Sequence, residues 1–473
     1  MNTRAQIIRN VRRGGTRCPQ RAAANPGAVE YPRSAEDCGR YLKSQRGSAL
    51  IIVLWVAFGL VTLALYFGQS MSFELRGSDN ASAALEADQA IQGAARYVTN
   101  VLVRVTQPGL IPETNTYSCA DMKIGDARAW FIGRNDGQNH GVNAAWGLVD
   151  EGSKLNLNVV TIDMLELLPR MTPEIAAAII DWRDSDENPT DNGAESDWYM
   201  RQNPPYYAKN TNYETVGELR LVAGMDLDSL YGEDANLNGI LDLNENDSDT
   251  SMPFDNRDGR LDPGFMEYFT VYTRIPTIGT NINNQQDVQA LVEQFGGAGT
   301  KLNLAPPQGG WRSMLEFYMT SGLSLDLMMK IEGYLVCTNA TNALVNINTA
   351  SQEVLACIPG IGIELAPQVI AYRQSNPTQL NTIAWLPQAL GWTAQNNTTN
   401  IQQVGPWVCG RAFQFSADIA AVGHHGRGYK RVKYVFDVAD GFAKVRLRED
   451  LTYLGWALGK QVRDSILLAS NTR

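Results

Sequence analysis

The 473-residue chain is long enough for two or three domains and carries a formal net charge of −10. Charged residues make up 19% and aromatic residues 9% of it, which excludes a disordered protein. Six cysteines are too few for a disulfide scaffold. Cys18 and Cys38 lie in the basic N-terminal segment. The other four, which leave room for one or two bridges, are Cys119, Cys337, Cys357 and Cys409.

One apolar segment near the N-terminus organises the chain. No charged residue occurs from Gly47 to Phe73, and a helix needs about 20 apolar residues to cross a bilayer. Residues 1–47 hold ten Lys and Arg against three Asp and Glu, a net charge of +7, so the rest of the chain carries −17. Because basic residues stay on the cytoplasmic side, we expect a single-pass anchor that contacts lipid through residues 48–67, with the acidic bulk outside the cytoplasm.

The small-residue junction Arg46-Gly47-Ser48 precedes the apolar run. A secretory signal peptide has its cleavage site after that run. The order found here resembles the leader of type IV prepilins, whose peptidase cuts after a Gly on the cytoplasmic side and leaves the helix as an anchor. The resemblance implies a basic leader at 1–47 and cleavage between Gly47 and Ser48. An ordinary anchor with a chance Gly is the alternative. Pilins carry Glu at the fifth mature position, where this chain has Ile52.

The helix is predicted to continue beyond the membrane. Small and apolar residues recur there every three or four positions, the spacing of one helical face. They are Ala84, Ala87, Ile91, Ala94, Val98, Val101 and Val105. Pro108-Gly109 is expected to end the helix. Residues 48–107 would then form a pilin-like spine, although any single-pass anchor with a helical stalk has the same pattern.

An antiparallel sheet is predicted in two parts, at 108–152 and at 401–473. Runs of apolar or alternating residues separated by turn formers indicate its strands. The expected strands are Ala129–Ile132, Ala145–Val149, Ala412–Val422, Tyr429–Val438 and Lys444–Arg448.

Residues 153–400 are predicted to form an inserted helical domain with an internal repeat of offset 190. Matching pairs need no gap, and each copy has an Asn-rich start, a helix, a turn at Pro and a second helix. The pairs include Asn156 and Asn346, Asn158 and Asn348, Leu165 and Leu355, Pro169 and Pro359, Ile180 and Ile370, and Arg183 and Arg373. The second helices are expected at Ile175–Trp182 and Leu365–Arg373. Further helices are predicted at Trp311–Tyr334 and Leu386–Trp392.

The second copy, Ile358-Pro359-Gly360-Ile361-Gly362-Ile363, resembles the helix-hairpin-helix of DNA-binding proteins. There, backbone N–H groups of the turn hold a phosphate. Phosphate binding also calls for nearby Lys or Arg, yet Glu364 follows the turn and the exported part is acidic. We therefore expect a structural hairpin and no nucleic acid, and keep a membrane-anchored DNA-binding or DNA-uptake protein as the alternative function.

Four segments in combination resemble the K-type minor pseudopilin of type II secretion (general secretion pathway protein K family). They are Lys154–Asn158, Asp181–Asp186, Gly193–Glu195 and Glu218–Met225. The resemblance covers most of the chain from Arg46 onward. It implies an α+β, pilin-like fold in which a large helical domain with two helix-hairpin-helix-like units interrupts the sheet.

The same resemblance implies a function. A K-type pseudopilin would lie in the inner membrane with its bulk in the periplasm, be cut by prepilin peptidase and be methylated. It would join other minor pseudopilins, cap the pseudopilus tip and promote assembly for protein export. It would also account for Ile52, because K-type members lack the fifth-position Glu, whose partner would be a subunit above.

A twelve-residue segment, 234–245, fits an EF-hand calcium loop. Calcium needs six to eight oxygen ligands from a chain that turns sharply, and Gly239 stands at the sixth position. The expected ligands are Asp234, Asn236, Asn238, the Ile240 carbonyl, Asp242 and Glu245. No flanking helix pair is evident, so the loop is interpreted as a structural staple and not a sensor.

A second, weaker loop follows. Phe254 and Phe265 occupy its first and twelfth positions, so neighbouring carboxylates would have to substitute. Its candidate ligands are Asp255, Asn256, Asp258, Asp262 and Glu267. One or two Ca²⁺ ions are therefore expected in all.

No catalytic or organic-cofactor site is predicted, and the chain is expected not to be an enzyme. A membrane-anchored hydrolase would need a nucleophile and a base, and no such motif occurs. The three histidines, His140, His424 and His425, lie in Gly-rich loops.

Overall fold

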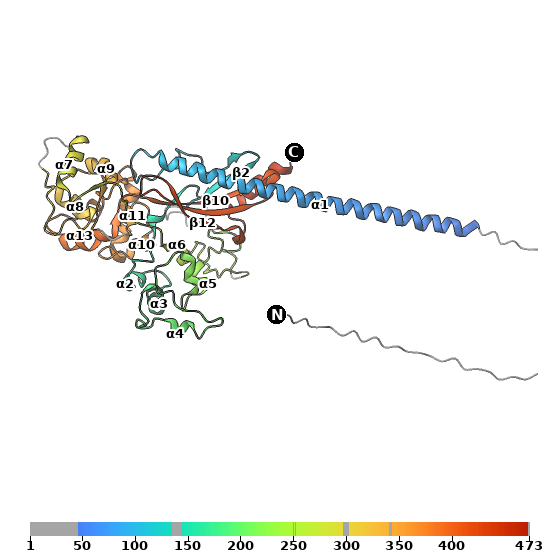
Figure 1. Cartoon of the computed structure of the whole chain (residues 1–473), viewed down its shortest axis with the longest axis horizontal. Helices are drawn as coiled ribbons and strands as arrows, with labels where there is room; N and C mark the ends of the chain where they lie inside the picture. Colours follow the sequence, from blue (N-terminus) through green and yellow to red (C-terminus); the bar gives the residue numbers. More distant parts are fainter. Residues whose placement is uncertain are drawn as a thin grey trace, which may run out of the picture. The chain divides into compact units, whose positions relative to one another are not determined.

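The computed structural model describes residues 46–134, 144–248, 250, 252–296, 302–339 and 343–471, without the side chains of 46–48 and 469–471. Contacts within the chain divide it into two units between Met71 and Ser72. The second unit contains the sheet and all helices after α1 (Figure 1).

The first unit holds the N-terminal part of α1, a helix with bounds Arg46–Val103. Large apolar side chains here are exposed on every face, including Leu50, Trp55 and Phe67. The segment is long and apolar enough to cross a membrane, and none of its most apolar window is buried. Such a helix is typical of a membrane span, so it is consistent with a single-pass anchor. Gly47 and Ser48 lie in its first turn, and residues 1–45 of the expected leader lie outside the described residues.

The part of α1 that belongs to the second unit is amphipathic, as predicted. Ala87, Ile91, Ala94 and Val98 are completely buried. They form one hydrophobic core with residues of the sheet, such as Phe131 and Ile419. Small residues at three- and four-residue spacing let the helix lie close to the sheet.

The sheet of the second unit has six antiparallel strands in the order β1-β2-β10-β11-β12, with β3 also paired to β10. Their bounds are β1 Met122–Ile124, β2 Ala127–Ile132, β3 Val149–Asp150, β10 Gln414–Val422, β11 Lys430–Asp437 and β12 Lys444–Asp450. The strand β10 is buried along its whole length because β2 and β11 flank it and both of its faces are covered. The C-terminal helix α14 (Gly459–Asn471) packs on the face that bears Trp130.

Between β3 and β10 the chain leaves the sheet and forms a mainly helical region. The helices are α2 Ile162–Leu165, α3 Pro173–Arg183, α4 Ser196–Tyr199, α5 Leu227–Tyr231, α6 Phe265–Tyr268, α7 Gln285–Gln294, α8 Met314–Ser321, α9 Leu325–Ile331, α10 Gln352–Ala356, α11 Gly362–Ser375, α12 Leu386–Leu390 and α13 Thr398–Val404. A separate large hydrophobic core, which includes Trp385 and Phe317, holds these helices together.

The internal repeat of the sequence corresponds to a repeated unit in the structure. Each predicted copy starts with a short strand in a parallel pair: β4 (Leu155–Asn156) with β5 (Phe269–Thr270), and β8 (Val345–Asn346) with β9 (Val408–Cys409). The structure adds a third such pair, β6 (Thr280–Asn281) with β7 (Leu335–Val336). In all three, the first Asn of an Asn-x-Asn sequence accepts a hydrogen bond from the backbone N–H of the second.

The two arginines of the repeat make equivalent bonds. Arg183 donates to the carbonyls of Leu157 and Val160, and Arg373 donates to those of Ile347 and Ala350. Each acceptor in the second copy lies 190 residues after its counterpart. The turns also match in backbone conformation, because Arg170 has φ 63° where the second copy has Gly360 with φ 87°.

Some expected elements differ in the structure. Ala145–Val149 does not form one strand, since Trp146 bridges to Ile132 of β2 while Val149 pairs with β10. A segment that changes partner within three residues cannot keep one ladder. The helix α1 ends at Val103, before the expected stop at Pro108. Of the four cysteines among the described residues, whose pairing the sequence left open, Cys119, Cys357 and Cys409 are free thiols, and the Cys337 thiol donates to the Trp311 carbonyl.

A histidine holds the β10–β11 turn against α1. His424 Nδ1 lies 2.7 Å from Glu86 Oε2, and its Nε2 lies 2.8 Å from Asp79 Oδ1. Arg427 also pairs with Asp79. Hydrogen bonds to Asp79 and Glu86 raise the pKa of His424 above its ordinary value of 6.5. Nothing in the sequence indicated this contact, which joins residues more than 300 positions apart.

We expect this contact to make stability depend on pH. A histidine whose pKa is raised by folding stabilises the fold fully below its unfolded pKa, and this contribution is lost as the pH rises through the folded pKa. His424→Gln should therefore lower the midpoint of urea unfolding at pH 6 and have little effect at pH 9. His425→Asn, at the exposed neighbour, is the control. An equal loss at both pH values would show that protonation does not matter.

Candidate functional site

The first predicted calcium loop lies between α5 and α6 and is closed by its two end carboxylates. Asp234 accepts hydrogen bonds from the backbone N–H groups of Asn238 (2.9 Å) and Gly239 (2.8 Å). Glu245 accepts from those of Ala235 (3.2 Å) and Asp242 (2.9 Å). Gly239 has φ 70°, so the sixth position makes the sharp turn for which a Gly was expected.

The charges in this loop are unbalanced. Asp234 is 3% exposed and Glu245 is completely buried. Burial, together with the charge of Asp234, raises the pKa of Glu245 to about 8, and burial raises that of Asp234. In addition, Asn236 Oδ1 is buried and accepts no hydrogen bond from any described residue. A cation among these groups would satisfy the lone oxygen and relieve the repulsion, so the residues fit calcium.

The remaining expected ligands converge on the same place. Asn236 Nδ2 and Asn238 Nδ2 donate to the same oxygen of Asp242, at 2.8 and 3.0 Å. The Ile240 side chain is buried. The structure thus brings the six residues of the first loop into one compact turn.

Two arginines bind the first loop through its backbone. Arg431 of β11 is completely buried; it pairs with Asp418 of β10 and donates to the carbonyls of Asn236 and Leu237. Arg134 pairs with Glu267 at 2.9 Å and also donates to the Leu237 carbonyl at 3.1 Å. Both guanidinium groups therefore fix the loop to other elements. Neither forms an ion pair with the loop's carboxylates, although the charge of Arg134 opposes the rise in the pKa of Asp234.

The second predicted loop is organised differently. Asp255 accepts from the N–H groups of Ser248 and Arg257, each at 2.7 Å, and Asn256 and Asp258 accept from the N–H two residues on. Asp262 forms an ion pair with Arg170, and Glu267 pairs with Arg134. Two of the five expected ligands are thus bound by arginines, so a calcium site in this loop stays a prediction.

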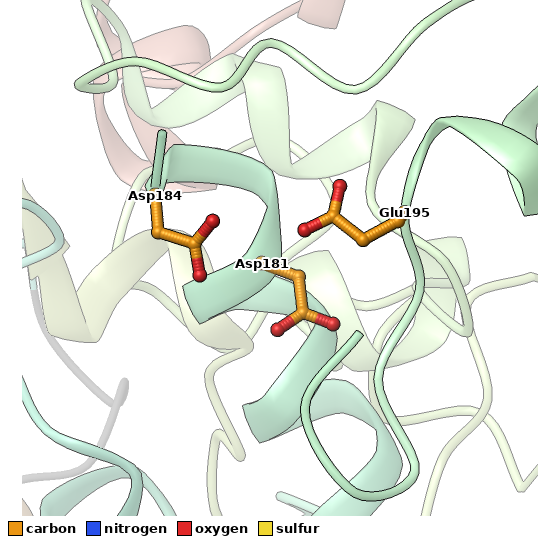
Figure 2. Close-up of side chains that lie close together, drawn as sticks. All are labelled: Asp181, Asp184 and Glu195. Carbon is orange, nitrogen blue, oxygen red and sulfur yellow. The ribbon is translucent and has the colours of Figure 1, made fainter. Parts of the chain in front are cut away.

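Sequence reasoning missed two buried carboxylates. Glu233 is completely buried and accepts from the N–H groups of Asn256 (2.8 Å) and Asp262 (2.9 Å), so it ties the second loop to the start of the first. Glu195 approaches Asp181 and Asp184 from another segment, as Figure 2 shows. The sequence places Asp181 and Asp184 a few residues before Glu195, but only the folded structure shows that the three carboxylates lie close together.

In the described part of the helical hairpins the arginines have partners within the domain, including Arg170 at the first turn, which pairs with Asp262. Arg183 and Arg373, the arginines of the repeat, donate to backbone carbonyls within the domain. Glu364 lies in the first turn of α11, next to the turn that would hold the phosphate. The hairpin geometry therefore favours a structural role.

Comparisons with known proteins agree on one family. A family model described as type II secretion system (T2SS), protein K, matches residues 156–231, and a helix-hairpin-helix motif model matches residues 341–384. Type II secretion system protein K of Klebsiella pneumoniae is 47% identical over 58 residues, which are 12% of this chain and 18% of that protein. Its counterpart from Pectobacterium carotovorum subsp. carotovorum is 28% identical over 204 residues, 39% of this chain and 60% of that protein. Both alignments thus cover less than two thirds of the relative.

Solved structures also match. Among them is the crystal structure of the GspK-GspI-GspJ complex from the enterotoxigenic Escherichia coli type 2 secretion system, with a TM-score of 0.39 and 12% identity over 80% of this chain and 99% of that chain. Because the TM-score is below 0.5, nothing about this chain is concluded from that match.

We expect the buried pair of Arg431 and Asp418 to be essential for stability. Asp418→Asn would leave a buried guanidinium without its charged partner, at a cost of about 3–5 kcal/mol. Urea unfolding at neutral pH measures this change. The control is Arg128→Gln. It breaks the exposed ion pair between Arg128 of β2 and Asp121, and it should lower the free energy of unfolding by only about 0–1 kcal/mol. Equal losses in the two variants would contradict the account.

Proposed function

We propose that the chain is a member of the type II secretion system protein K family, to which it is similar in sequence, and that it acts as a minor pseudopilin that caps the pseudopilus tip and promotes its assembly. The observation that supports this proposal most strongly is the exposed apolar part of α1. It occurs in a chain whose residues 156–231 match the family model of protein K. Because α1 also contributes to the core of the sheet, one helix can serve as anchor and as filament spine.

The proposed processing follows from the N-terminal sequence. Prepilin peptidase would cut between Gly47 and Ser48, and the new N-terminus would be methylated. Until extraction, residues 48–67 would contact lipid in the inner membrane. The charge of +7 in residues 1–47 against −17 in the remainder supports a cytoplasmic leader and a periplasmic bulk.

The tip position is supported by one residue. Cleavage after Gly47 makes Ile52 the fifth mature residue, where a pilin has Glu. Without that carboxylate the subunit could have others below it but could not dock beneath one. Other minor pseudopilins would be its neighbours at the tip.

Calcium would act as a staple in this function. Asp234, Asn236, Asn238, the Ile240 carbonyl, Asp242 and Glu245 would hold one ion in the first loop. The ion would supply positive charge to a buried acidic turn that Arg134 and Arg431 fix to the rest of the domain. Its role would be to keep the domain folded outside the cell interior, where calcium at roughly millimolar levels can fill even weak sites.

The DNA-binding alternative is not favoured. A match to the helix-hairpin-helix motif at residues 341–384 describes a fold unit, and its arginine is buried. No enzymatic activity is proposed.

We expect Ile52→Glu to test the tip assignment. If the missing carboxylate sets the position, the variant should be found along the pseudopilus as well as at its tip, by cross-linking to the major subunit in a secreting strain. Ile52→Leu, which adds no charge, should remain at the tip. Mass spectrometry should find a mature chain that starts at Ser48 in both variants. A Glu variant confined to the tip would show that the size of the domain, not Ile52, decides.

A further inference from the structure

The turn between β10 and β11 lies against α1 close to the point where α1 first becomes buried. Ala83 is the first buried residue of α1 among those whose side chains are described. Gly423 and Gly428 of the turn approach it so closely that a Cβ on either would clash with the Ala83 backbone. Four residues before Ala83, Asp79 bonds to His424 of the same turn. The turn is therefore fixed to this part of α1.

The C-terminal helix α14 packs directly on the same turn. A Cβ on Gly426 would clash with the side chain of Ile466, so the turn and the helix touch without a gap. Val462 and Ile466 also pack against the core around Trp130 of the sheet. These two residues define the inward side of α14, which Figure 1 shows beside α1. The helix is thus held, through the turn, next to the part of α1 around Asp79.

The outward side of α14 combines basic and apolar residues. Lys460, Arg463 and Leu467 are three and four residues apart, so they share one side of the helix. All three are exposed, and Leu468 is exposed on the adjoining side. The exposed fractions of the two leucines are 52% and 68%. Asp464 is the acidic residue of the helix, so two basic residues against one acidic residue leave a net charge of +1.

The surface of a membrane spanned by α1 would lie close to this helix. The charge-free stretch of α1 ends at Phe73. It is about 40 Å long, which is close to the thickness of a bilayer with its headgroups. Asp79 follows about 9 Å further along the helix axis. Since this distance is about one Debye length at physiological ionic strength, basic side chains held next to Asp79 are within electrostatic reach of the headgroups.

We propose that α14 binds anionic phospholipid headgroups at the membrane surface from which α1 emerges. Lys460 and Arg463 supply positive charge, and Leu467 and Leu468 enter the headgroup layer. The chain from Ser48 onward carries −17, so an anionic surface would otherwise repel it. The helix holds the second unit against the membrane until extraction of α1 breaks the contact. This rests on the proposed function only in requiring that α1 spans a membrane.

Hydrogen–deuterium exchange of the full chain in nanodiscs measures this contact. The discs contain either phosphatidylcholine alone or phosphatidylcholine with phosphatidylglycerol, which is anionic. We expect the backbone amides of α14 to exchange roughly tenfold more slowly in the anionic discs, and high salt to remove the difference. The amides of α7, in the inserted helical region, are the internal control and should exchange equally in both kinds of disc.

Exposed side chains can be changed without disturbing the core. Lys460→Gln combined with Arg463→Gln should remove most of the protection, because each basic residue near an anionic surface strengthens binding about fivefold. The matched control is Lys123→Gln combined with Arg312→Gln, which removes the same charge from exposed positions on β1 and before α8. This control should keep the protection of α14.

The apolar contribution is tested by Leu467→Ser combined with Leu468→Ser. This double variant should weaken the protection of α14 at every salt concentration, because the leucines enter the headgroup layer independently of charge.

Co-flotation with vesicles tests the anchor separately in the same preparation. A chain that does not float would contradict the proposed function. A chain that floats, but whose α14 amides exchange equally fast in both kinds of disc, would overturn the lipid contact alone. Protection that appears only after other minor pseudopilins are added would show that the outward side of α14 is a protein interface, and would also overturn it.

Discussion

The inserted region depends on how buried negative charge is balanced. In the first loop, Arg431 and Arg134 bind backbone carbonyls, while Asp234 and Glu245 are buried close enough for the charge of Asp234 to raise the pKa of Glu245. Arg431 is completely buried, and Asp418 is its charged partner in the sheet. A loop that fixes its backbone to the sheet through arginine, yet keeps its carboxylates together, is suited to a cation that enters after folding.

The helical region gains its order from a small unit used three times. Each unit pairs a strand that contains an Asn with a strand far along the chain, and the Asn side chain bonds the backbone two residues later. In two of the three units an arginine, Arg183 or Arg373, donates hydrogen bonds to backbone carbonyls of the same unit. These bonds occupy arginines that a DNA-binding hairpin would expose to a phosphate.

The features of the fold and of the candidate site that depend on residues close together in the chain could be predicted from the sequence. The spacing of Ala87, Ile91 and Ala94 gave the amphipathic half of α1, and the repeat offset gave the equivalence of Arg183 and Arg373. The first loop could be proposed because its ligands lie within twelve residues. Partners far apart in the sequence could not be predicted. Asp262 and Glu267 were expected to bind calcium, but Asp262 pairs with Arg170, 92 residues away, and Glu267 pairs with Arg134, 133 residues away. The contact of His424 with α1 was missed for the same reason.

The central claim is that cations balance the buried carboxylates of the insertion. The most direct measurement is anomalous X-ray scattering from crystals of the protein grown with Ca²⁺. We predict one peak among Asp234, Asn236, Asp242 and Glu245. Well-ordered loops with no anomalous peak at the first site would contradict the account.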